Sequence, residues 1–424
     1  MVQTQIGYNP DGSVRTWDYN PEVARESLCR LIAATDLPLG FGENPAFENF
    51  IKTAHNPRFS VVSRQTTTRD MIKYYNAGKE KLKESFNTCT FSVSLTSDIW
   101  GGRAKEDYIS VVAHYINDDW ELEKRIIGFK VIDVAHTAEN IADSICKVVE
   151  DFGLTDKIFS ITLDNAAANT AAMDILTPVF NSYAQSFLLH QRCACHIINL
   201  IVKCGLKHLD PYITAFRSAI AFLNGSNQRV AQYKNYCLAL QVRPRKFALD
   251  MPVRWNSTYM MLKSIVPHQG TFSVFINTHF RSPDGSQLLT DAHWDVARKL
   301  LSFLELFYDS TVALSGIYYP TSPLIVQHVL DIATHLHTYE NDILLRDVVV
   351  AMKSKYLKYW REIPLLYAFA FILDPRAKLS GLGNVFGLIS DVVGIDYSAY
   401  FTHVHDKLSE VYGKYDQKYA GTRK

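Results

Sequence analysis

Hydrophobic and polar residues alternate strictly over residues 90–98, where Phe91, Val93 and Leu95 are separated by serine and threonine. This period of two is typical of a β-strand with one buried face. Two further runs, rich in β-branched and aromatic residues, occupy positions 108–116 and 122–134. Because turn residues separate the three runs, we predict that they form an antiparallel meander.

The spacing of apolar residues becomes helical over residues 137–152, where Ile141, Ile145 and Val148 lie on one face. A short apolar run at residues 157–163 then predicts a fourth strand that is buried on both faces. The remaining elements of this region are a helix at 166–179, a fifth strand at 187–190 and a helix at 195–206. The order β-β-β-α-β-α-β-α predicts a ribonuclease-H-like core, a mixed sheet with helices, over residues 87–207.

Helical spacing dominates on both sides of this core. We predict a small helical region at residues 21–86, preceded by a flexible lead-in at residues 1–20, and an all-helical domain at residues 208–424. The fold class is therefore α/β followed by all-α. The predicted helices of the last domain cover residues 212–224, 231–241, 257–266, 292–315, 323–339, 343–361 and 397–415. Glycines at positions 381, 383 and 387 predict a loop before the final helix.

The composition supports a folded protein of two or three domains. The chain has 424 residues, of which 47% are hydrophobic and 12% aromatic, enough for a full core. The first fifteen residues resemble no secretory signal, and no apolar run approaches the roughly 20 residues of a membrane span. Seven scattered cysteines indicate a reducing, intracellular compartment. We therefore expect no membrane association.

The charge is distributed unevenly although the whole chain carries only +1. Residues 192–254 contain ten Lys or Arg against two acids, a local charge of +8. Such a stretch suits a DNA backbone, although a solvated helical face is an equally good explanation. Its basic residues include Arg192, Arg243, Arg245, Lys246 and Arg254. In this stretch Arg254 precedes Trp255, and the pair could hold a phosphate and stack on an unpaired base, whereas a lone Trp usually belongs to a core.

Two aspartates end predicted strands, Asp98 after the first and Asp164 after the fourth. A ribonuclease-H-like nuclease holds two divalent ions about 3.5–4 Å apart with three or four carboxylates, and Mg²⁺ or Mn²⁺ prefers such oxygen ligands. The positions of Asp98 and Asp164 fit this role, and we predict Mg²⁺ or Mn²⁺ there. The alternative is that each Asp only caps a turn.

A cysteine and histidine cluster, Cys193-Ala-Cys195-His196, follows the fifth predicted strand. A structural zinc site usually has four ligands in two spaced pairs, and no second pair follows at finger-like spacing. We therefore expect no zinc. We predict instead that Cys193 and His196 line a polar site beside the two aspartates, close to Arg192.

Five ordered motifs together resemble the hAT superfamily of DNA transposases, especially the plant sleeper-type zinc finger BED domain-containing proteins. The motifs are Ser94-Leu-Thr-Ser-Asp98-Ile-Trp100, Thr162-Leu-Asp164-Asn165-Ala-Ala-Ala-Asn169, Arg192-Cys-Ala-Cys-His196-Ile-Ile-Asn199-Leu200, Pro252-Val-Arg-Trp255-Asn-Ser-Thr258 and Ile372-Leu-Asp374-Pro-Arg376-Ala-Lys378. They span nearly three hundred residues, and the resemblance as a whole covers residues 25–415.

The resemblance implies roles for individual residues. Asp98 and Asp164 match the first two acids of the family's Asp-Asp-Glu triad. Cys193 and His196 match its Cys-x-x-His motif beside the active site. Arg254-Trp255 matches the Arg-Trp pair that steadies flanking DNA. The helical second half resembles the insertion domain that interrupts the family's ribonuclease-H-like fold.

Other family features have no match in the sequence. We expect that the chain lacks the BED finger, the C-terminal dimerisation region and the third catalytic acid, a glutamate. The expected function is therefore that of a nuclear, transposase-derived protein that binds DNA weakly or nonspecifically, without catalysis or a small-molecule substrate. Transposase-like or chromatin proteins are its expected partners. Two alternatives stay open: a metal-dependent transposase fragment whose glutamate comes from elsewhere, and a protein-protein interaction module.

Overall fold

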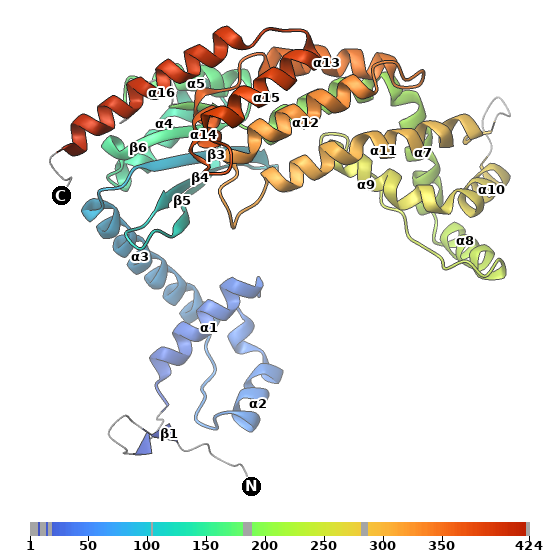
Figure 1. Ribbon diagram of the computed structural model, residues 1–424. Coiled ribbons are helices and arrows are strands. Elements are labelled where there is room, and N and C mark those ends of the chain that lie inside the picture. Colours follow the sequence, from blue (N-terminus) through green and yellow to red (C-terminus); the bar gives the residue numbers. More distant parts are fainter. Residues whose placement is uncertain are drawn as a thin grey trace. The chain divides into compact units, whose positions relative to one another are not determined.

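The computed structural model describes residues 7–8, 14–15, 19–102, 105–180, 189–280 and 287–420. Two compact units make up the chain, Met1–Thr90 and Phe91–Lys424 (Figure 1). The lead-in predicted at residues 1–20 lies outside the described residues, apart from the paired strands β1 (Gly7–Tyr8) and β2 (Val14–Arg15) and the two residues before the first helix.

The first unit consists mainly of three helices, α1 (Pro21–Thr35), α2 (Pro45–Ala54) and α3 (Arg64–Thr88). Each begins where a polar side chain accepts hydrogen bonds from free backbone N–H groups, at Asn20, Asn44 and Ser63. A proline occupies the first turn of α1 and of α2, where its missing N–H costs nothing. Arg25 on α1 donates two hydrogen bonds to Asp70 on α3, which ties these helices together.

The second unit contains a five-stranded mixed sheet with the strand order β5-β4-β3-β6-β7. Its strands are β3 (Val93–Gly101), β4 (Asp107–Ile116), β5 (Leu122–Ile132), β6 (Ile158–Leu163) and β7 (His190–Arg192). Strands β3, β4 and β5 pair antiparallel, which confirms the predicted meander, whereas β3, β6 and β7 run parallel. The fifth strand begins three residues later than predicted, and positions 187–188 lie outside the described residues.

The two faces of this sheet differ in chemistry. Helices α4 (Ala138–Asp151) and α5 (Ala167–Leu176) lie together on one face (Figure 1). The strand residues on this face are fully buried and include Val93, Leu95, Ile109, Val111 and Ala113. A Cβ on Gly128 of β5 would lie 2.8 Å from Val148 of α4, so only glycine lets this helix approach so closely. The opposite face carries hydroxyl side chains, among which Ser160 donates to Ser94 over 3.0 Å.

Helices form the rest of the second unit. They are α6 (Ala194–Leu206), α7 (Asp210–Asn224), α8 (Asn227–Ala239), α9 (Trp255–Ile265), α10 (Gln269–His279), α11 (Asp291–Leu314), α12 (Ile325–Thr338), α13 (Arg346–Trp360), α14 (Leu365–Leu373), α15 (Lys378–Val393) and α16 (Ser398–Tyr419). Short 3-10 helices cover Phe41–Glu43, Thr155–Lys157, Lys207–Leu209, Val266–His268 and Ser322–Leu324. The fold class, a ribonuclease-H-like core with a helical region, is confirmed.

One hydrophobic core extends through these helices from Ala194 on α6 to Val404 on α16. Within it α6 and α13 approach closely, because a Cβ on Gly205 would lie 2.6 Å from Met352 Sδ. The core therefore continues across the boundary predicted between residues 207 and 208. No helix in the described ranges combines the length and the apolar character needed to cross a bilayer.

The loop predicted from glycines 381, 383 and 387 is wrong, because α15 covers all three. Leu382, Phe386 and Ile389 recur at helical spacing and are buried. Their burial outweighs the cost of about 1 kcal/mol that each glycine adds to a helix. Helices α10 and α14 were not predicted either. The run of apolar residues in α14 has no polar face, so its period alone does not reveal a helix.

Candidate functional site

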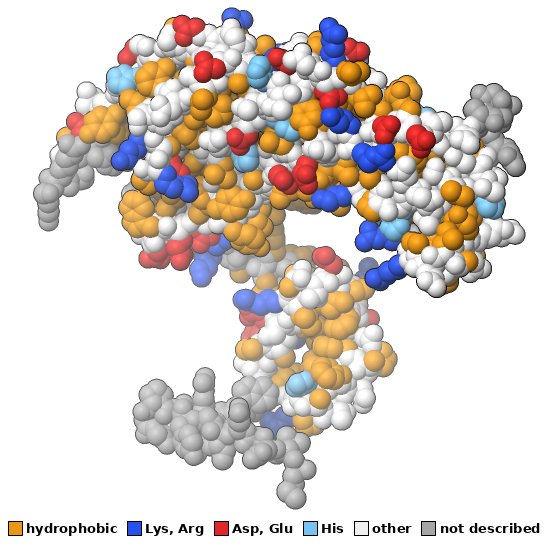
Figure 2. Space-filling model, turned by 45° about the vertical axis from the view of Figure 1, so that its right-hand side comes forward, with side chains coloured by type: hydrophobic (Ala, Val, Ile, Leu, Met, Phe, Trp, Pro, Cys, Tyr) orange, Lys and Arg blue, Asp and Glu red, His pale blue; other side chains and the backbone are white. Residues whose placement is uncertain are grey.

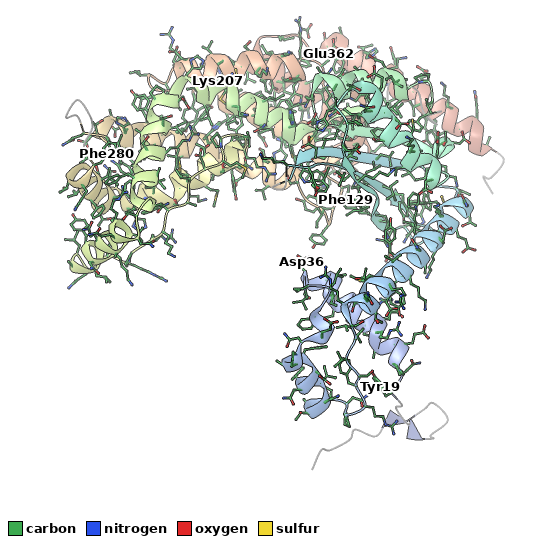
Figure 3. The ribbon with its side chains drawn as sticks, turned by 180° about the vertical axis from the view of Figure 1, so that it is seen from behind. Tyr19, Asp36, Phe129, Lys207, Phe280 and Glu362 are labelled. Carbon is green, nitrogen blue, oxygen red and sulfur yellow. The ribbon has the colours of Figure 1, made fainter. Side chains whose placement is uncertain are left out.

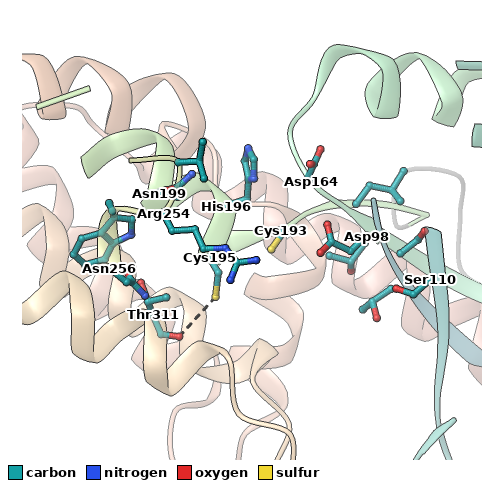
Figure 4. A pocket seen from close by; sticks show the side chains of 16 residues that line it. Asp98, Ser110, Asp164, Cys193, Cys195, His196, Asn199, Arg254, Asn256 and Thr311 are labelled. Atoms are coloured by element: carbon teal, nitrogen blue, oxygen red, sulfur yellow. Dashed lines mark hydrogen bonds between the residues drawn. The ribbon is translucent and has the colours of Figure 1, made fainter. Parts of the chain in front are cut away.

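The pocket that contains both predicted aspartates lies where parallel strands end. Thr96 of β3 pairs with Thr162 of β6, so Asp98 and Asp164 follow two residues later at the same edge of the sheet. Figure 4 shows both carboxylates turned toward the same space, which has a volume of about 440 Å³. Their placement follows directly from the parallel register of two neighbouring strands.

Asp98 keeps access to solvent but lies among groups that change its acidity. Its partial burial and the nearby charge of Asp164 both raise its pKa above the ordinary value of an aspartate. A hydrogen bond of 3.1 Å from the N–H of Ile99, together with His196 and Arg254, acts in the opposite direction. A cation that contacts both carboxylates would relieve this repulsion.

Asp164 is positioned by the turn that begins α5. Its Oδ1 accepts a hydrogen bond from the backbone N–H of Ala166 over 2.8 Å and another from the side-chain amide of Asn169 over 2.6 Å. The adjacent Asn165 donates from Nδ2 to the carbonyl of Cys193 over 3.4 Å. The carboxylate is therefore fixed in direction by amides from its own turn, and this turn is joined to the start of α6.

The first turns of α6 form the next wall of the pocket. The N–H of Cys193 donates to the carbonyl of Leu163 over 2.8 Å, so α6 begins beside the end of β6. This contact brings Cys193, His196 and Asn199 into the pocket lining. His196 and Asn199 are three residues apart on one helix and face the same side (Figure 4). Both can donate a hydrogen bond to an oxygen in the pocket.

Arg254 reaches the pocket from a turn far along the chain. It is the N-cap residue of α9, and Ser257 Oγ holds this turn by accepting from the N–H of Met251 over 2.7 Å and donating to the carbonyl of Arg254 over 2.6 Å. Asp250 begins this turn and is anchored by a two-point ion pair with Arg217, over 2.8 and 2.7 Å. The buried carboxylate of Asp250 thus fixes the segment that presents Arg254.

Burial of Asp250 would raise its pKa, but the hydrogen bonds from Arg217 and Thr258 outweigh this effect. The pKa of Asp250 therefore lies below its ordinary value. Its side chain is 1% exposed and that of Arg217 is 23% exposed, so the pair is largely shielded from solvent. No sequence pattern reveals this pair, because its members lie 33 residues apart on different elements.

The structure brings most of the predicted site residues together but not all of them. Asp98, Asp164, Cys193, His196 and Arg254 all line the same pocket. The remaining predicted basic residues are exposed outside this lining: Arg192 beside the end of α13, and Arg243, Arg245 and Lys246 between α8 and α9. Their role in DNA binding stays a prediction.

Trp255 borders the pocket but exposes little surface to it. The residue is 2% exposed and belongs to the hydrophobic core of the helical part. Its indole ring would have to leave that core to stack on a base, so stacking by Trp255 stays a prediction that requires the ring to move. The alternative weighed for a lone tryptophan, that it packs in a core, describes its position.

A row of aromatic rings near Asp98 was missed by sequence reasoning. Trp100 of β3 stacks on Tyr108 of β4 with ring centroids 6.0 Å apart, and Tyr108 stacks on Phe129 of β5 at 5.5 Å. Phe129, labelled in Figure 3, is 60% exposed and Trp100 is 36% exposed. Only the cross-strand register places these residues side by side, which explains why the sequence did not reveal the row.

The donor set suits one divalent cation rather than a complete two-metal centre. Asp98 and Asp164 are the carboxylates of the pocket lining, and a Mg²⁺ or Mn²⁺ ion held by them would need further oxygens from water or a phosphate. Within the described ranges, no group of three or more His, Cys, Asp or Glu side chains is arranged to hold a metal. Lys and Arg side chains are scattered over the face seen in Figure 2. The positive charge of Arg254 therefore acts locally at the pocket rather than as part of a broad basic surface.

Comparison with known proteins matches three successive family models. The model for the ZBED1 RNase-like domain matches residues 96–189, and that for the ZBED1 RNase-like helical domain matches residues 191–303. The model for the hAT-like transposase RNase-H fold matches residues 324–415. These matches cover the sheet, the pocket and the helices that follow.

Similar full-length proteins come mainly from plants. Zinc finger BED domain-containing protein RICESLEEPER 2 of Oryza sativa is 27% identical over 397 residues, which is 92% of this chain and 54% of that protein. The putative AC transposase of Zea mays is 28% identical over 373 residues, 86% of this chain and 46% of that protein. DAYSLEEPER of Arabidopsis thaliana is 24% identical over 403 residues, 94% of this chain and 57% of that protein. The chain spans about half the length of these curated relatives.

Proposed function

Because the chain belongs to the hAT family of transposase-like proteins, we propose that it binds DNA at the pocket between β3, β6, α6 and α9. One observation carries the proposal: a pair of carboxylates and an arginine from distant segments line the same open pocket. A phosphodiester is the group that such a mixed set recognises, since its oxygens can contact a cation and an arginine together.

Arg254 has the first role in this proposal. Its guanidinium would donate to a phosphate oxygen, with its direction fixed by Ser257 and by the anchored Asp250. His196 and Asn199 would donate hydrogen bonds to further oxygens of the same strand. These contacts carry no sequence information, so we propose binding with little sequence preference.

Asp98 and Asp164 would hold Mg²⁺ or Mn²⁺ in the bound complex. When bound, such an ion supplies positive charge to the phosphate oxygens and lowers the pKa of a bound water. The two aspartates would orient the DNA strand by fixing the position of this charge. Asn169 and the N–H of Ala166 would keep Asp164 directed into the pocket.

We further propose that the 424-residue chain by itself binds DNA without cleaving it. Two carboxylates line the pocket, whereas a nuclease of the two-metal type uses three or four to hold both ions. The alternative is metal-dependent cleavage after a further carboxylate joins the site from another chain or segment. The placement of Asp98 and Asp164 at adjacent strand ends favours this second function enough to test it.

A titration with labelled duplex DNA tests both proposals. The full chain is mixed with duplex at several salt concentrations, with Mn²⁺, with Mg²⁺ or with a chelator, and the products are run on a denaturing gel. We expect binding that weakens as salt rises, because phosphate contacts release counterions, and we expect intact DNA. Nicks or hairpins that disappear in Asp98→Asn and Asp164→Asn variants would establish cleavage instead.

Two arginine variants locate the binding surface. Arg254→Ala should weaken DNA binding about tenfold and reduce the salt dependence, since one phosphate contact is lost. Arg346→Ala is the matched control, because Arg346 is exposed at the start of α13 and lies outside the pocket lining. Equal effects of the two variants would mean that binding depends on general charge and not on the pocket.

Nuclear localisation and protein partners are part of the same proposal. Relatives named as transposases and BED zinc finger proteins support a role at chromosomal DNA. A fluorescent fusion of the full chain in plant cells tests this. Fluorescence that is absent from the nucleus would contradict it. Recovery of transposase-like or chromatin proteins after crosslinking would identify the partners.

A further inference from the structure

Two thiols share the pocket with the carboxylates and have no role in the function proposed above. Cys193 is the N-cap residue of α6 and Cys195 lies in the first turn of that helix. Both are free cysteines, both are partly accessible, and both line the pocket. The pocket gives small molecules a route to a pair of sulfur atoms.

The geometry of this pair permits a disulfide. Residues two apart in the first turn of a helix have Cα atoms about 5.5 Å apart, which lies within the range of about 4.4–6.8 Å seen for disulfides. The two thiols lie close enough for each to shift the pKa of the other. Cys193 has non-helical backbone angles, φ −58° and ψ 115°, and its carbonyl accepts the first helical hydrogen bond from Ile197 over 3.1 Å, so closing the disulfide requires this first turn to adjust.

Their environment also makes one thiol more reactive than the other. Interaction with the neighbouring Cys193 thiol lowers the pKa of Cys195 to about 7, although burial acts against this. The same interaction, together with burial, raises the pKa of Cys193. Cys195 Sγ lies 3.6 Å from Ser315 Oγ, which can stabilise a thiolate further. A thiolate at neutral pH is the form that reacts with oxidants.

We propose that Cys193 and Cys195 form a redox-modification site, at which a small hydroperoxide converts the dithiol into an intramolecular disulfide. Cys195 is the residue that attacks the peroxide, and Cys193 is the residue that resolves the product. The single helical turn and the shared pocket distinguish this pair from the other described cysteines: Cys204 lies more than two turns further along α6 and outside the pocket lining, and the rest lie on other segments.

The reaction proceeds in two balanced steps. First, the Cys195 thiolate attacks one oxygen of hydrogen peroxide, the O–O bond breaks, and sulfenic acid and hydroxide form; the hydroxide takes up the proton that the thiol had released. Second, the Cys193 sulfur attacks the sulfenic sulfur, the S–S bond forms, and the S–O bond breaks, with the hydroxyl leaving as water together with the Cys193 proton. Two thiols are oxidised and one peroxide is reduced to two waters.

Formation of the disulfide would change the structure around the two carboxylates. The backbone of Cys193 donates to Leu163 and accepts from Asn165, the residues on either side of Asp164. Closing a disulfide across Cys193 would therefore shift the turn that fixes Asp164. An effect of this shift on DNA binding rests on the function proposed above, whereas the modification itself does not.

Peptide mass analysis of the full chain tests the modification directly. Trypsin cleaves after Arg192 and Lys203, so residues 193–203 form one peptide that holds both thiols and no other cysteine. The protein is treated with hydrogen peroxide, free thiols are blocked with a maleimide, and the mass of the tryptic peptide is measured by mass spectrometry. We expect loss of two hydrogens and of both maleimide sites, reversed by dithiothreitol.

Cys146 provides an internal standard for rate. It is partly accessible, burial raises its pKa, and it is the one cysteine in the tryptic peptide of residues 131–147. We expect the 193–203 peptide to lose free thiol at least about tenfold faster, because thiolate content controls the reaction. Equal rates for the two peptides, or absence of the disulfide, would overturn the proposal.

Single serine variants assign the roles of the two thiols. In Cys193→Ser, Cys195 should accumulate as sulfenic acid, which dimedone traps, whereas in Cys195→Ser the remaining thiol should react slowly. The opposite pattern would overturn the assigned order. Binding of duplex DNA before and after oxidation is measured separately. A failure to bind DNA would contradict the proposed function, whereas the mass of the peptide alone decides whether the disulfide forms.

Discussion

The two faces of the central sheet are built from the same strands but are stabilised in different ways. The face under α4 and α5 consists of side chains such as Val93 and Leu95 that are fully buried. The opposite face carries hydroxyls, a histidine and, at the strand ends, Asp98 and Asp164. One face is fixed by packing, which depends little on pH, and the other by polar contacts, which leave room for a ligand.

This difference shows why the pocket lies where it does. The alternation along β3 sends each second residue to the packed side, so the polar residues between them necessarily meet on the other side. A polar face of this kind cannot be closed by apolar helices without leaving hydroxyls unpaired. The comparison leads to four predictions, from the largest expected change in stability to the smallest.

The first prediction contrasts neighbours on the two faces. Leu95→Ala should lower the free energy of unfolding by about 2–5 kcal/mol, because it leaves a cavity beneath α4 and α5. Thr96→Ala removes one hydrogen bond to His114, 3.0 Å long, and should cost about 1 kcal/mol. Urea denaturation followed by circular dichroism compares them. Similar losses would mean that both faces are packed alike.

The second prediction concerns the ion pair that supports the pocket. Asp250→Asn should cost about 3 kcal/mol at neutral pH, because Arg217 loses its buried partner. The folded-state pKa of Asp250 is lowered, so its contribution is present above the ordinary pKa of about 4 and is lost as pH falls through the folded value. Wild type and variant should therefore become similar in stability at acid pH.

Thermal unfolding at a series of pH values measures this convergence. Thr258→Val serves as a partial control, because it removes one hydrogen bond to Asp250 but keeps the ion pair. A stability difference between wild type and Asp250→Asn that does not change with pH would contradict the ionic explanation.

The third prediction uses one substitution in two packing environments. Gly205→Ala should destabilise by about 1–2 kcal/mol, because a Cβ there would lie 2.6 Å from Met352 and 2.9 Å from Val348. Gly387→Ala should stabilise by about 0.5–1 kcal/mol, since nothing lies within 4 Å of its Cβ position and alanine favours the helix. Guanidinium denaturation measures both. Changes of the same sign would show that close approach of α6 and α13 does not decide the effect.

The fourth prediction affects stability least and ligand binding most. Asp98→Asn should change the free energy of unfolding by only about 0.5 kcal/mol, because the raised pKa of Asp98 shows that its charge is not stabilised in the folded protein. The same variant should lose binding of Mn²⁺, measured by calorimetry, as should Asp164→Asn. Undiminished Mn²⁺ binding in both variants would place the ion elsewhere.

The resemblance, which rests on five ordered motifs, and the fold class were both correct from sequence, and for the fold class the reason is local. The period of two in residues 90–98 and the helical period in residues 137–152 reflect burial on one face of each element. The glycines of α15 misled the prediction because their cost is local, whereas the packing of Phe386 against Tyr397 and Phe401 that offsets it comes from α16.

The sequence by itself determined the order of strands and helices in the sheet region, most of the later helices, and the placement of Asp98 and Asp164 at strand ends, because each depends on short-range periodicity and on the order of strands. The tertiary structure alone decided that Trp255 is buried, that Asp250 holds the turn of Arg254, and that Cys193 joins the turn of Asp164. These facts depend on contacts between segments far apart along the chain. Such contacts leave no periodic trace in a single sequence, and only folding brings their atoms within bonding distance.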